Sequence, residues 1–218
     1  MIGIVVALYN EIKGSIETIS AKEKNCKAGK RIFTGKIHGK EVVFILSGVG
    51  KVNAALSTQF LIDNYPIDYI INFGSVGGIS GQVKIADYYI IDKCCQYDFD
   101  TSAIDNVPIG YIQDYDTVYF YPKTDKIDFL PKISLASSDR FTEKETDVNT
   151  IRNLACAVFD MEGGAIAQVC KANDVPLYIF KGVTDLHGSG NDVNTFYKNL
   201  NSVCSGFFEI LEKTLAAL

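Results

Sequence analysis

The stretch Ala157–Cys170 reads Ala-Val-Phe-Asp-Met-Glu-Gly-Gly-Ala-Ile-Ala-Gln-Val-Cys and carries two carboxylates where a buried strand runs into a helix. Asp160 and Glu162 follow the apolar residues 157–159, and two glycines then begin a segment with a helical pattern. Acidic side chains at the end of a buried strand cost free energy unless something there uses them. Ligands of open α/β sheets bind outside the carboxyl ends of the strands. The stretch therefore predicts a ligand site.

Three other apolar segments run into polar residues in the same way. They are residues 2–8 before Glu11, 68–73 before Ser75, and 177–183 before Thr184-Asp185. Each polar residue alone is explained equally well as a helix cap or a solvated turn residue. Taken together with Glu162, they favour one shared site at neighbouring strand ends. Carboxylates beside glycines suit a small polyhydroxylated ligand.

Composition and charge limit the class of protein. The chain has 218 residues, of which 47% are hydrophobic and 22% charged, so we expect one α/β domain over residues 1–218. Its net charge is −5, with scattered Lys and Arg, which disfavours a nucleic-acid partner. No apolar run approaches the roughly 20 residues of a membrane span, and the N-terminus lacks the pattern of a signal peptide. No membrane partner is expected.

The cysteines and histidines argue against a metal site. The cysteines are Cys26, Cys94, Cys95, Cys156, Cys170 and Cys204. Most of them lie in apolar surroundings without the paired spacing of metal ligands, so we expect buried free thiols and a reducing, cytoplasmic compartment. Only His38 and His187 exist, which excludes a site with three histidine ligands. We expect neither a metal nor a cofactor.

The remaining segments complete an alternation of strands and helices. Strand-like segments cover 31–37, 41–47, 87–93 and 133–137, helical segments cover 52–64 and 193–218, and 96–123 is a long loop. The first two strands are separated by His38-Gly39-Lys40 and form a predicted hairpin. Thr142-Glu143-Lys144-Glu145 has the spacing of a capping box, which predicts a helix start just beyond Phe141. The fold class is α/β, with a mixed, twisted central sheet flanked by helices.

The sequence does not match several common catalytic and ligand-binding motifs. Ser47-Gly48-Val49-Gly50-Lys51 is a glycine turn before a helix, but it lacks the spacing and the Lys-Ser/Thr pair of a P-loop. Ser75 is not a nucleophile elbow, because Phe73 stands where that motif needs glycine. No dinucleotide fingerprint and no Cys–His pairing is evident. Acid–base chemistry by carboxylates is the simplest hypothesis.

An ordered set of motifs resembles the 5′-methylthioadenosine/S-adenosylhomocysteine nucleosidases of the nucleoside phosphorylase superfamily. The motifs are Ala7–Glu11, Ser47–Lys51, Asn72–Gly78, Asp160–Glu162 and Thr184-Asp185. The resemblance runs from the first strand to the final helix and is weakest over 105–135. It implies a nucleoside phosphorylase-like fold, a homodimer, and hydrolysis of the N-glycosidic bond of an adenosine thioether to adenine and a 5-thio-substituted ribose.

The resemblance also implies a role for each matching residue. Asp185 would protonate adenine at N7, and Glu11 would activate water. Glu162 would accept hydrogen bonds from the ribose hydroxyls, Met161 would pack on the sugar, Ser75 would orient the polar network, Phe141 would stack on adenine, and the backbone at Thr142 would read its edge. Asp185 can act as an acid near neutrality only if its pKa lies well above the ordinary ~3.9. Burial and neighbouring carboxylates both raise a carboxyl pKa.

Two departures from the family pattern stand out. Lys181 replaces an arginine that the family usually has near the catalytic water, and lysine keeps the charge but loses the planar fork. Residues 96–104 follow only partly a segment that, in relatives, joins the dimer interface and reaches the partner's 5′-thio pocket. The 5′ subsite would be lined by Leu8, Val49, Thr101, Ile104 and Phe196. Ordinary core positions explain these residues equally well.

Three other functions compete with hydrolysis of an adenosine thioether. A phosphorolytic purine nucleoside phosphorylase needs a cationic phosphate site, but segments 47–51 and 74–78 contain no arginine, and only Lys51 is nearby. A nucleoside-binding protein without turnover would not need both Glu11 and Asp185. A hydrolase acting on aminofutalosine would share the same groups.

Overall fold

The computed structural model describes residues 1–25, 29–187 and 193–218. The strands are β1 (Ile2–Val6), β2 (Lys22–Asn25), β3 (Arg31–Ile37), β4 (Lys40–Leu46), β5 (Tyr69–Ile79), β6 (Tyr88–Gln96), β7 (Lys132–Ser137), β8 (Val158–Asp160) and β9 (Leu177–His187). The helices are α1 (Tyr9–Thr18), α2 (Lys51–Asn64), α3 (Ser102–Asp105), α4 (Glu145–Asn153), α5 (Gly163–Ala172), α6 (Val193–Ser205) and α7 (Phe207–Ala217), with a 3-10 turn η1 at Gln113–Tyr115. The predicted mixed α/β architecture is confirmed.

The nine strands form one sheet in the order β2-β3-β4-β1-β5-β8-β7-β6-β9. Strand β5 pairs in parallel with β9 along its full length, while its other edge pairs first with β1 and then with β8. Because β9 also pairs with β6, strands β5, β8, β7, β6 and β9 close into a ring. The sheet therefore closes on itself in the part formed by these five strands.

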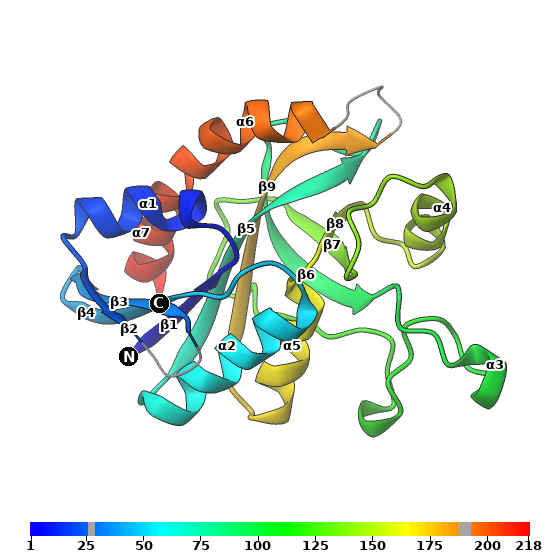
Figure 1. The fold of residues 1–218 in the computed structure, drawn as a ribbon, viewed down its shortest axis with the longest axis horizontal. Helices are drawn as coiled ribbons and strands as arrows, with labels where there is room; N and C mark the ends of the chain where they lie inside the picture. Colours follow the sequence, from blue (N-terminus) through cyan, green and yellow to red (C-terminus); the bar gives the residue numbers. More distant parts are fainter. Residues whose placement is uncertain (26–28, 188–192) are drawn as a thin grey trace.

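Helices cover both faces of the sheet (Figure 1). Helices α1, α6 and α7 lie on one face, and α2 and α5 lie together on the other. The first face holds a core that includes Ile12, Val203 and Phe207, and the second holds one that includes Leu61 and Ile166. The chain between β6 and β7, which carries α3 and η1, extends away from this layered body.

Two predicted strands are longer than their apolar segments. Strand β5 continues through residues 74–78 because each glycine pairs with β9, and β9 continues to His187. Ser75 and Asp185 therefore lie within strands rather than after them, and Asp185 is opposite Gly77 beside a register shift. The predicted hairpin is confirmed, but its turn has two residues rather than three, because Ile37 pairs with Lys40. Strand β2 was not predicted.

The predicted helix start near Thr142 is wrong. Helix α4 begins at Glu145, and Lys144 occupies its N-cap without a side-chain bond. The Thr142 hydroxyl is instead hydrogen-bonded to the Tyr97 hydroxyl at 2.8 Å. A tertiary hydrogen bond thus replaces the local capping bond that the sequence spacing suggested.

The predicted C-terminal helix is two helices that meet at Gly206. The Tyr88 hydroxyl donates to the Val203 carbonyl at 2.6 Å, and a side chain at Gly206 would come within 2.4 Å of the Tyr88 oxygen. The contact of Tyr88 with the last turn of α6 therefore requires glycine at the junction. The predicted apolar stripe is otherwise confirmed, since Val203 and Phe207 are fully buried.

Candidate active site

A cavity of about 490 Å³ opens where the end of β8 lies beside Ser75–Gly77 of β5 and Asp185 of β9, next to the first turn of α1. This volume is in the range of pockets that hold small-molecule ligands. The lining residues are Ala7, Leu8, Tyr9, Asn10, Glu11, Val49, Ser75, Val76, Gly77, Arg140, Phe141, Thr142, Phe159, Asp160, Met161, Glu162, Asp185, Phe196, Tyr197 and Leu200. Much of the wall is apolar, and four carboxylates lie in it.

Glu11 is held by four hydrogen bonds. Its Oε2 accepts from the backbone N–H groups of Ala7 and Leu8 at 3.1 and 2.9 Å, as in one half of a capping box, because Leu8 is the N-cap of α1. Its Oε1 accepts from the backbone N–H and the hydroxyl of Ser75 at 2.9 and 3.1 Å. Burial raises the pKa of Glu11 above its ordinary value, while these bonds and the charge of Lys181 oppose the rise. The capping interpretation and the site interpretation therefore both apply to Glu11.

Glu162 lies across the cavity at the start of α5. Its Oε1 accepts a hydrogen bond from the Gly50 backbone N–H at 2.9 Å, which joins β8 to the N-terminus of α2. Burial, with the nearby negative charge of Asp160, raises the pKa of Glu162 to about 8. Because Glu162 makes no capping bond, its carboxyl group faces the cavity with one oxygen uncommitted to any protein donor described here.

Asp160 and Lys181 form a fully buried ion pair next to these carboxylates. The Lys181 Nζ lies 2.8 Å from Asp160 Oδ2, and both side chains are about 1% exposed. Asp160 also accepts hydrogen bonds from the Ser137 hydroxyl and the Gly163 backbone N–H. Removing either charge would leave its partner buried and uncompensated, which costs several kcal/mol. Lys181 therefore supplies a fixed positive charge behind the cavity wall.

Asp185 lies on β9 at the other side of the cavity. Its Oδ1 accepts a hydrogen bond from the Thr184 hydroxyl at 2.8 Å. A side chain at Gly77 would come within 2.9 Å of Asp185 Oδ2 and collide with Phe159, so the opposite strand must carry glycine here. Burial raises the pKa of Asp185, and the Thr184 bond opposes it only in part. Desolvation with so little compensation favours the protonated form.

The segment 140–142 forms part of the cavity wall, and hydrogen bonds of Tyr97 hold it in place. The Tyr97 hydroxyl contacts Thr142 Oγ1 at 2.8 Å, and the Ser138 hydroxyl donates to Tyr97 at 2.7 Å. Phe141 is 44% exposed and packs edge-on against Phe196. An aromatic face held at the rim of a cavity suits a planar ring such as a purine.

Most of the site residues predicted from the sequence meet at this cavity. They are Leu8, Glu11, Val49, Ser75, Phe141, Thr142, Met161, Glu162 and Asp185, joined by Phe196. Lys181 and Ile104 do not border it. Lys181 is buried against Asp160, and Ile104 is 85% exposed on α3.

Several lining residues were not predicted. Asp160 belongs to a predicted motif, but the resemblance implies no separate role for it. Its place between a buried strand and two glycines is a signal that could have identified it. Arg140, Tyr197 and Leu200 had no local signal, because only the packing of α6 and the 138–142 segment brings them to the cavity. Arg140 lies 3.4 Å from Asp147.

Within the described ranges, the other His, Cys, Asp and Glu side chains do not form a metal centre. No cluster of three or more His, Cys, Asp or Glu in residues 1–25, 29–187 and 193–218 is arranged to hold a metal ion. Five described cysteines are free and buried, as predicted, and Cys26 lies outside the described residues. No helix in the described part of the chain is long and apolar enough to cross a membrane.

Comparison with known proteins identifies the family. The family model described as the phosphorylase superfamily matches residues 1–216. A 5′-methylthioadenosine/S-adenosylhomocysteine nucleosidase of Staphylococcus carnosus is 34% identical, with all of both chains covered. This chain belongs to the 5′-methylthioadenosine/S-adenosylhomocysteine nucleosidase family. The family predicted from the sequence motifs is thereby confirmed, and the superfamily model covers residues 1–216.

Solved structures of nucleosidases share this fold. A nucleosidase from Colwellia psychrerythraea, solved in complex with adenine, is 29% identical, superposes with a TM-score of 0.90, and is matched over 100% of this chain and 95% of its own. A futalosine hydrolase of Helicobacter pylori superposes with a TM-score of 0.91 at 23% identity, covering 100% of this chain and 97% of its own, which shows a shared fold alone. The nucleosidase family therefore shares the architecture that brings the carboxylates of this chain together.

Proposed function

We propose that this protein hydrolyses the N-glycosidic bond of 5′-methylthioadenosine, S-adenosylhomocysteine or both, releasing adenine and a 5-thio-substituted ribose. The observation that carries the proposal is that Glu11, Glu162 and Asp185, from three separate elements, line one cavity in a member of the nucleosidase family. Water adds to the anomeric carbon, the carbon–nitrogen bond breaks, and the bonding electrons leave with adenine. Nearby carboxylates stabilise the positive charge that develops on the ribose.

Asp185 is the proposed general acid. Its burial and its single described hydrogen bond favour a carboxylic acid at neutral pH, and a carboxylic acid can give its proton to adenine N7. A protonated purine leaves as a neutral base. Phe141 would stack on the purine ring, and the backbone at Thr142 would read its edge, since both residues form the cavity wall on this side.

Glu11 is the proposed general base. Three backbone N–H groups and the Ser75 hydroxyl fix its carboxylate and favour the ionised form, which takes a proton from the attacking water. Ser75 thus orients Glu11 and does not act as a nucleophile. The buried Lys181 charge supports the same ionised state.

Glu162 and Met161 would hold the ribose. A protonated Glu162 still accepts a hydrogen bond through its carbonyl oxygen, and positive charge growing on the sugar favours its ionised form. Met161 offers a polarisable side chain for packing on the apolar face of the ribose. The Gly50 N–H fixes the carboxyl group for this contact.

Water rather than phosphate is the proposed nucleophile. Among the described residues that line the cavity, Arg140 is the only cation, and it faces Asp147. Lys51 is paired with Asp98 and Lys181 with Asp160, so neither ammonium group is free to bind phosphate. A phosphorolytic enzyme needs such a cation for its phosphate. The lining therefore supports hydrolysis over phosphorolysis.

We also propose that one domain over residues 1–218 assembles as a homodimer in the cytoplasm. Apolar side chains of Val52, Leu56 and Ile104 are 78%, 48% and 85% exposed, and a second copy of the chain would bury them. Leu8, Val49 and Phe196 line the subsite proposed for the 5′ substituent, and Ile104 would reach the partner's subsite from α3. Light scattering should give twice the mass of the chain, and a monomeric mass would contradict this part of the proposal.

The function is tested by assaying adenine release from purified full-length protein. Methylthioadenosine, S-adenosylhomocysteine and aminofutalosine are compared with and without phosphate, in water enriched in oxygen-18. Hydrolysis predicts release without phosphate and the heavy isotope in the sugar product. Strict dependence on phosphate would instead establish phosphorolysis. Adenine binding with no turnover by folded protein would establish a binding protein.

A further inference from the structure

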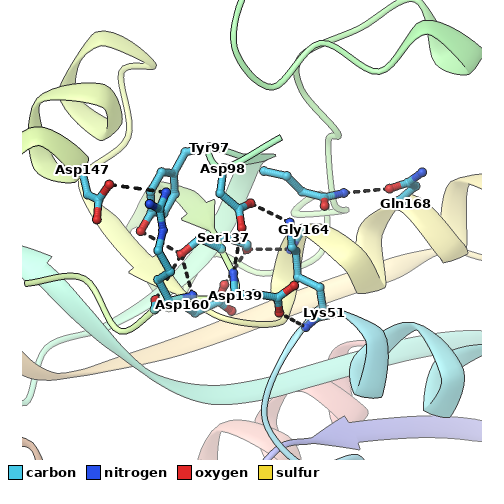
Figure 2. Close-up of polar contacts among 12 residues, drawn as sticks. Lys51, Tyr97, Asp98, Ser137, Asp139, Asp147, Asp160, Gly164 and Gln168 are labelled. Carbon is cyan, nitrogen blue, oxygen red and sulfur yellow. Dashed lines mark hydrogen bonds and ion pairs between the residues drawn. The ribbon is translucent and has the colours of Figure 1, made fainter. Parts of the chain in front are cut away.

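Three segments of the chain are tied together by a closed ring of hydrogen bonds (Figure 2). The Lys51 side chain donates to Asp98 Oδ1 at 2.6 Å. The backbone N–H of Asp139 donates to the other oxygen of Asp98 at 2.9 Å, and the backbone N–H of Lys51 donates to Asp139 Oδ1 at 2.7 Å. The ring therefore joins the N-terminus of α2, the chain after β6 and the chain after β7.

The Lys51–Asp98 pair in the ring is shielded more than an ordinary surface ion pair, while Asp139 is exposed. The side chains of Lys51 and Asp98 are 16% and 15% exposed, whereas exposed pairs such as Glu209–Lys213 exceed 50% on both sides. Both oxygens of Asp98 are used, and Asp139 places a negative charge at the N-terminus of α2, where a helix favours it. A shielded pair with this geometry holds its partners in place better than an exposed pair does.

Each segment of the ring leads directly to a group proposed to contact the substrate. Next to Lys51, the Gly50 N–H bonds the Glu162 carboxyl group. Asp139 is followed at once by the 140–142 segment of the cavity wall. Next to Asp98, Tyr97 braces Thr142 in that same segment. The sugar side and the purine side of the cavity are therefore connected through one small set of charged residues.

We propose that Asp98, together with Lys51 and Asp139, positions the Glu162 carboxyl group relative to the purine-binding segment 140–142. This inference rests on the proposed function and assigns residues that contact no substrate themselves. Loss of the ring frees the glycine turn at Gly50 and the 140–142 segment to move independently. A misplacement of about 1 Å in a catalytic group can cost about a hundredfold in rate.

The position of Glu162 has a signature in its titration. The Gly50 N–H bond lowers the pKa of Glu162, while burial raises it to about 8. Weakening that bond therefore raises the pKa further, and the limb of the pH–rate profile that belongs to Glu162 moves to higher pH. A role confined to stability would leave this limb where it is.

The test compares three variants that break the ring, one rescue variant and one control with the wild type. Asp98→Asn keeps the shape but removes the charge, Lys51→Met removes the ammonium group, and the double variant removes both. Lys51→Arg keeps the pair and serves as the conservative rescue. Glu209→Gln breaks an exposed pair on α7 and is the matched control. Steady-state kinetics, pH–rate profiles, adenine binding by calorimetry and melting temperature are measured for each.

If the ring positions Glu162, each single variant should lose about tenfold or more in kcat and bind adenine more weakly. The limb of the pH–rate profile that belongs to Glu162 should move to higher pH. The double variant should be no worse than the worse single variant, because the residues act as a unit. Lys51→Arg should retain most of the activity, and Glu209→Gln should match the wild type. Additive losses, or unchanged adenine binding and an unmoved pH limb, would overturn the inference. Failure of the wild type to release adenine would overturn the proposed function instead, and the adenine-binding results would still test the ring.

Discussion

The two sides of the cavity hold their carboxyl groups in opposite ways. On one side, Glu11 accepts four hydrogen bonds and lies in the field of the buried Lys181 cation. On the other side, Asp185 accepts one described hydrogen bond, from Thr184, and its pKa is raised by burial with no described cation among the causes. Both groups are buried to a similar degree, at 4% and 7% exposure. Burial raises the pKa of both groups, so the contrast comes from the hydrogen bonds and the cation that oppose this rise at Glu11.

The contrast shows how one cavity can keep a base and an acid at the same pH. Hydrogen bonds to a carboxylate favour its ionised form, and burial without them favours the neutral form. Glu11 is equipped to take a proton and Asp185 to give one. A pair of titratable groups with such different surroundings is what acid–base catalysis requires.

The largest expected effect comes from removing the acid. Asp185→Asn keeps the size and the Thr184 contact but cannot supply a proton, so kcat for adenine release should fall by about 10² to 10⁴. Binding of adenine, measured by calorimetry, should change far less. A loss confined to KM would show that Asp185 only binds the base, and the acid side of the comparison would fail.

The base side should respond nearly as strongly. Glu11→Gln places an amide NH₂ against N–H donors and removes the charge that accepts the proton, so kcat should fall by about a hundredfold or more. Glu17→Gln, on the exposed face of the same helix, is the matched control and should match the wild type. Equal activity of Glu11→Gln and the control in steady-state assays would remove Glu11 from the mechanism.

Ser75→Ala sharpens the comparison by removing one of the four bonds to Glu11. The backbone N–H of Ser75 remains, so kcat should fall by about tenfold, since a hydrogen bond to a charged group contributes at least about 1.5 kcal/mol. The acidic limb of the pH–rate profile should also move to higher pH, because Glu11 loses a donor that favours its ionised form. An unmoved limb would show that the hydroxyl does not tune Glu11.

A further expected effect is on stability as a function of pH. Burial raises the pKa of Glu162 from 4.5 to about 8, so the folded protein binds more protons than the unfolded chain between these values. Its free energy of unfolding should therefore be greatest near the lower value and decline as the pH rises to about 8. Glu11 and Asp185 act in the same direction. The melting temperature should depend less steeply on pH in Glu162→Gln than in the wild type. An identical slope in both proteins would contradict the raised pKa of Glu162.

The sequence predicts the strands that carry the site because their apolar runs are unambiguous. Segments 2–8, 68–73 and 177–183 all appear as strands, and the polar residues after them meet at one cavity. The lengths of β5 and β9 were underestimated, because their parallel pairing extends both strands through residues that have weak strand propensity alone. Local patterns thus predict which elements form, and pairing decides where they end.

The parts that could not be predicted depend on contacts distant in sequence. Thr142 fits a capping box, yet it bonds Tyr97, which follows β6, and the predicted C-terminal helix breaks at Gly206 because Tyr88 packs there. The resemblance places Lys181 near the catalytic water, in the position of the family's usual arginine, but the side chain is fully buried against Asp160. No local spacing reveals an ion pair between residues on β8 and β9.

The division of labour between acid and base is tested most directly by changing the leaving group. The 4-nitrophenolate of a 4-nitrophenyl 5-methylthioriboside leaves without being protonated. Hydrolysis of this substrate therefore needs Glu11 but not Asp185. We predict that Asp185→Asn cleaves this substrate at nearly the wild-type rate, while Glu11→Gln remains impaired on it and on methylthioadenosine alike. Equal losses for Asp185→Asn on both substrates would contradict the assignment of Asp185 as the acid.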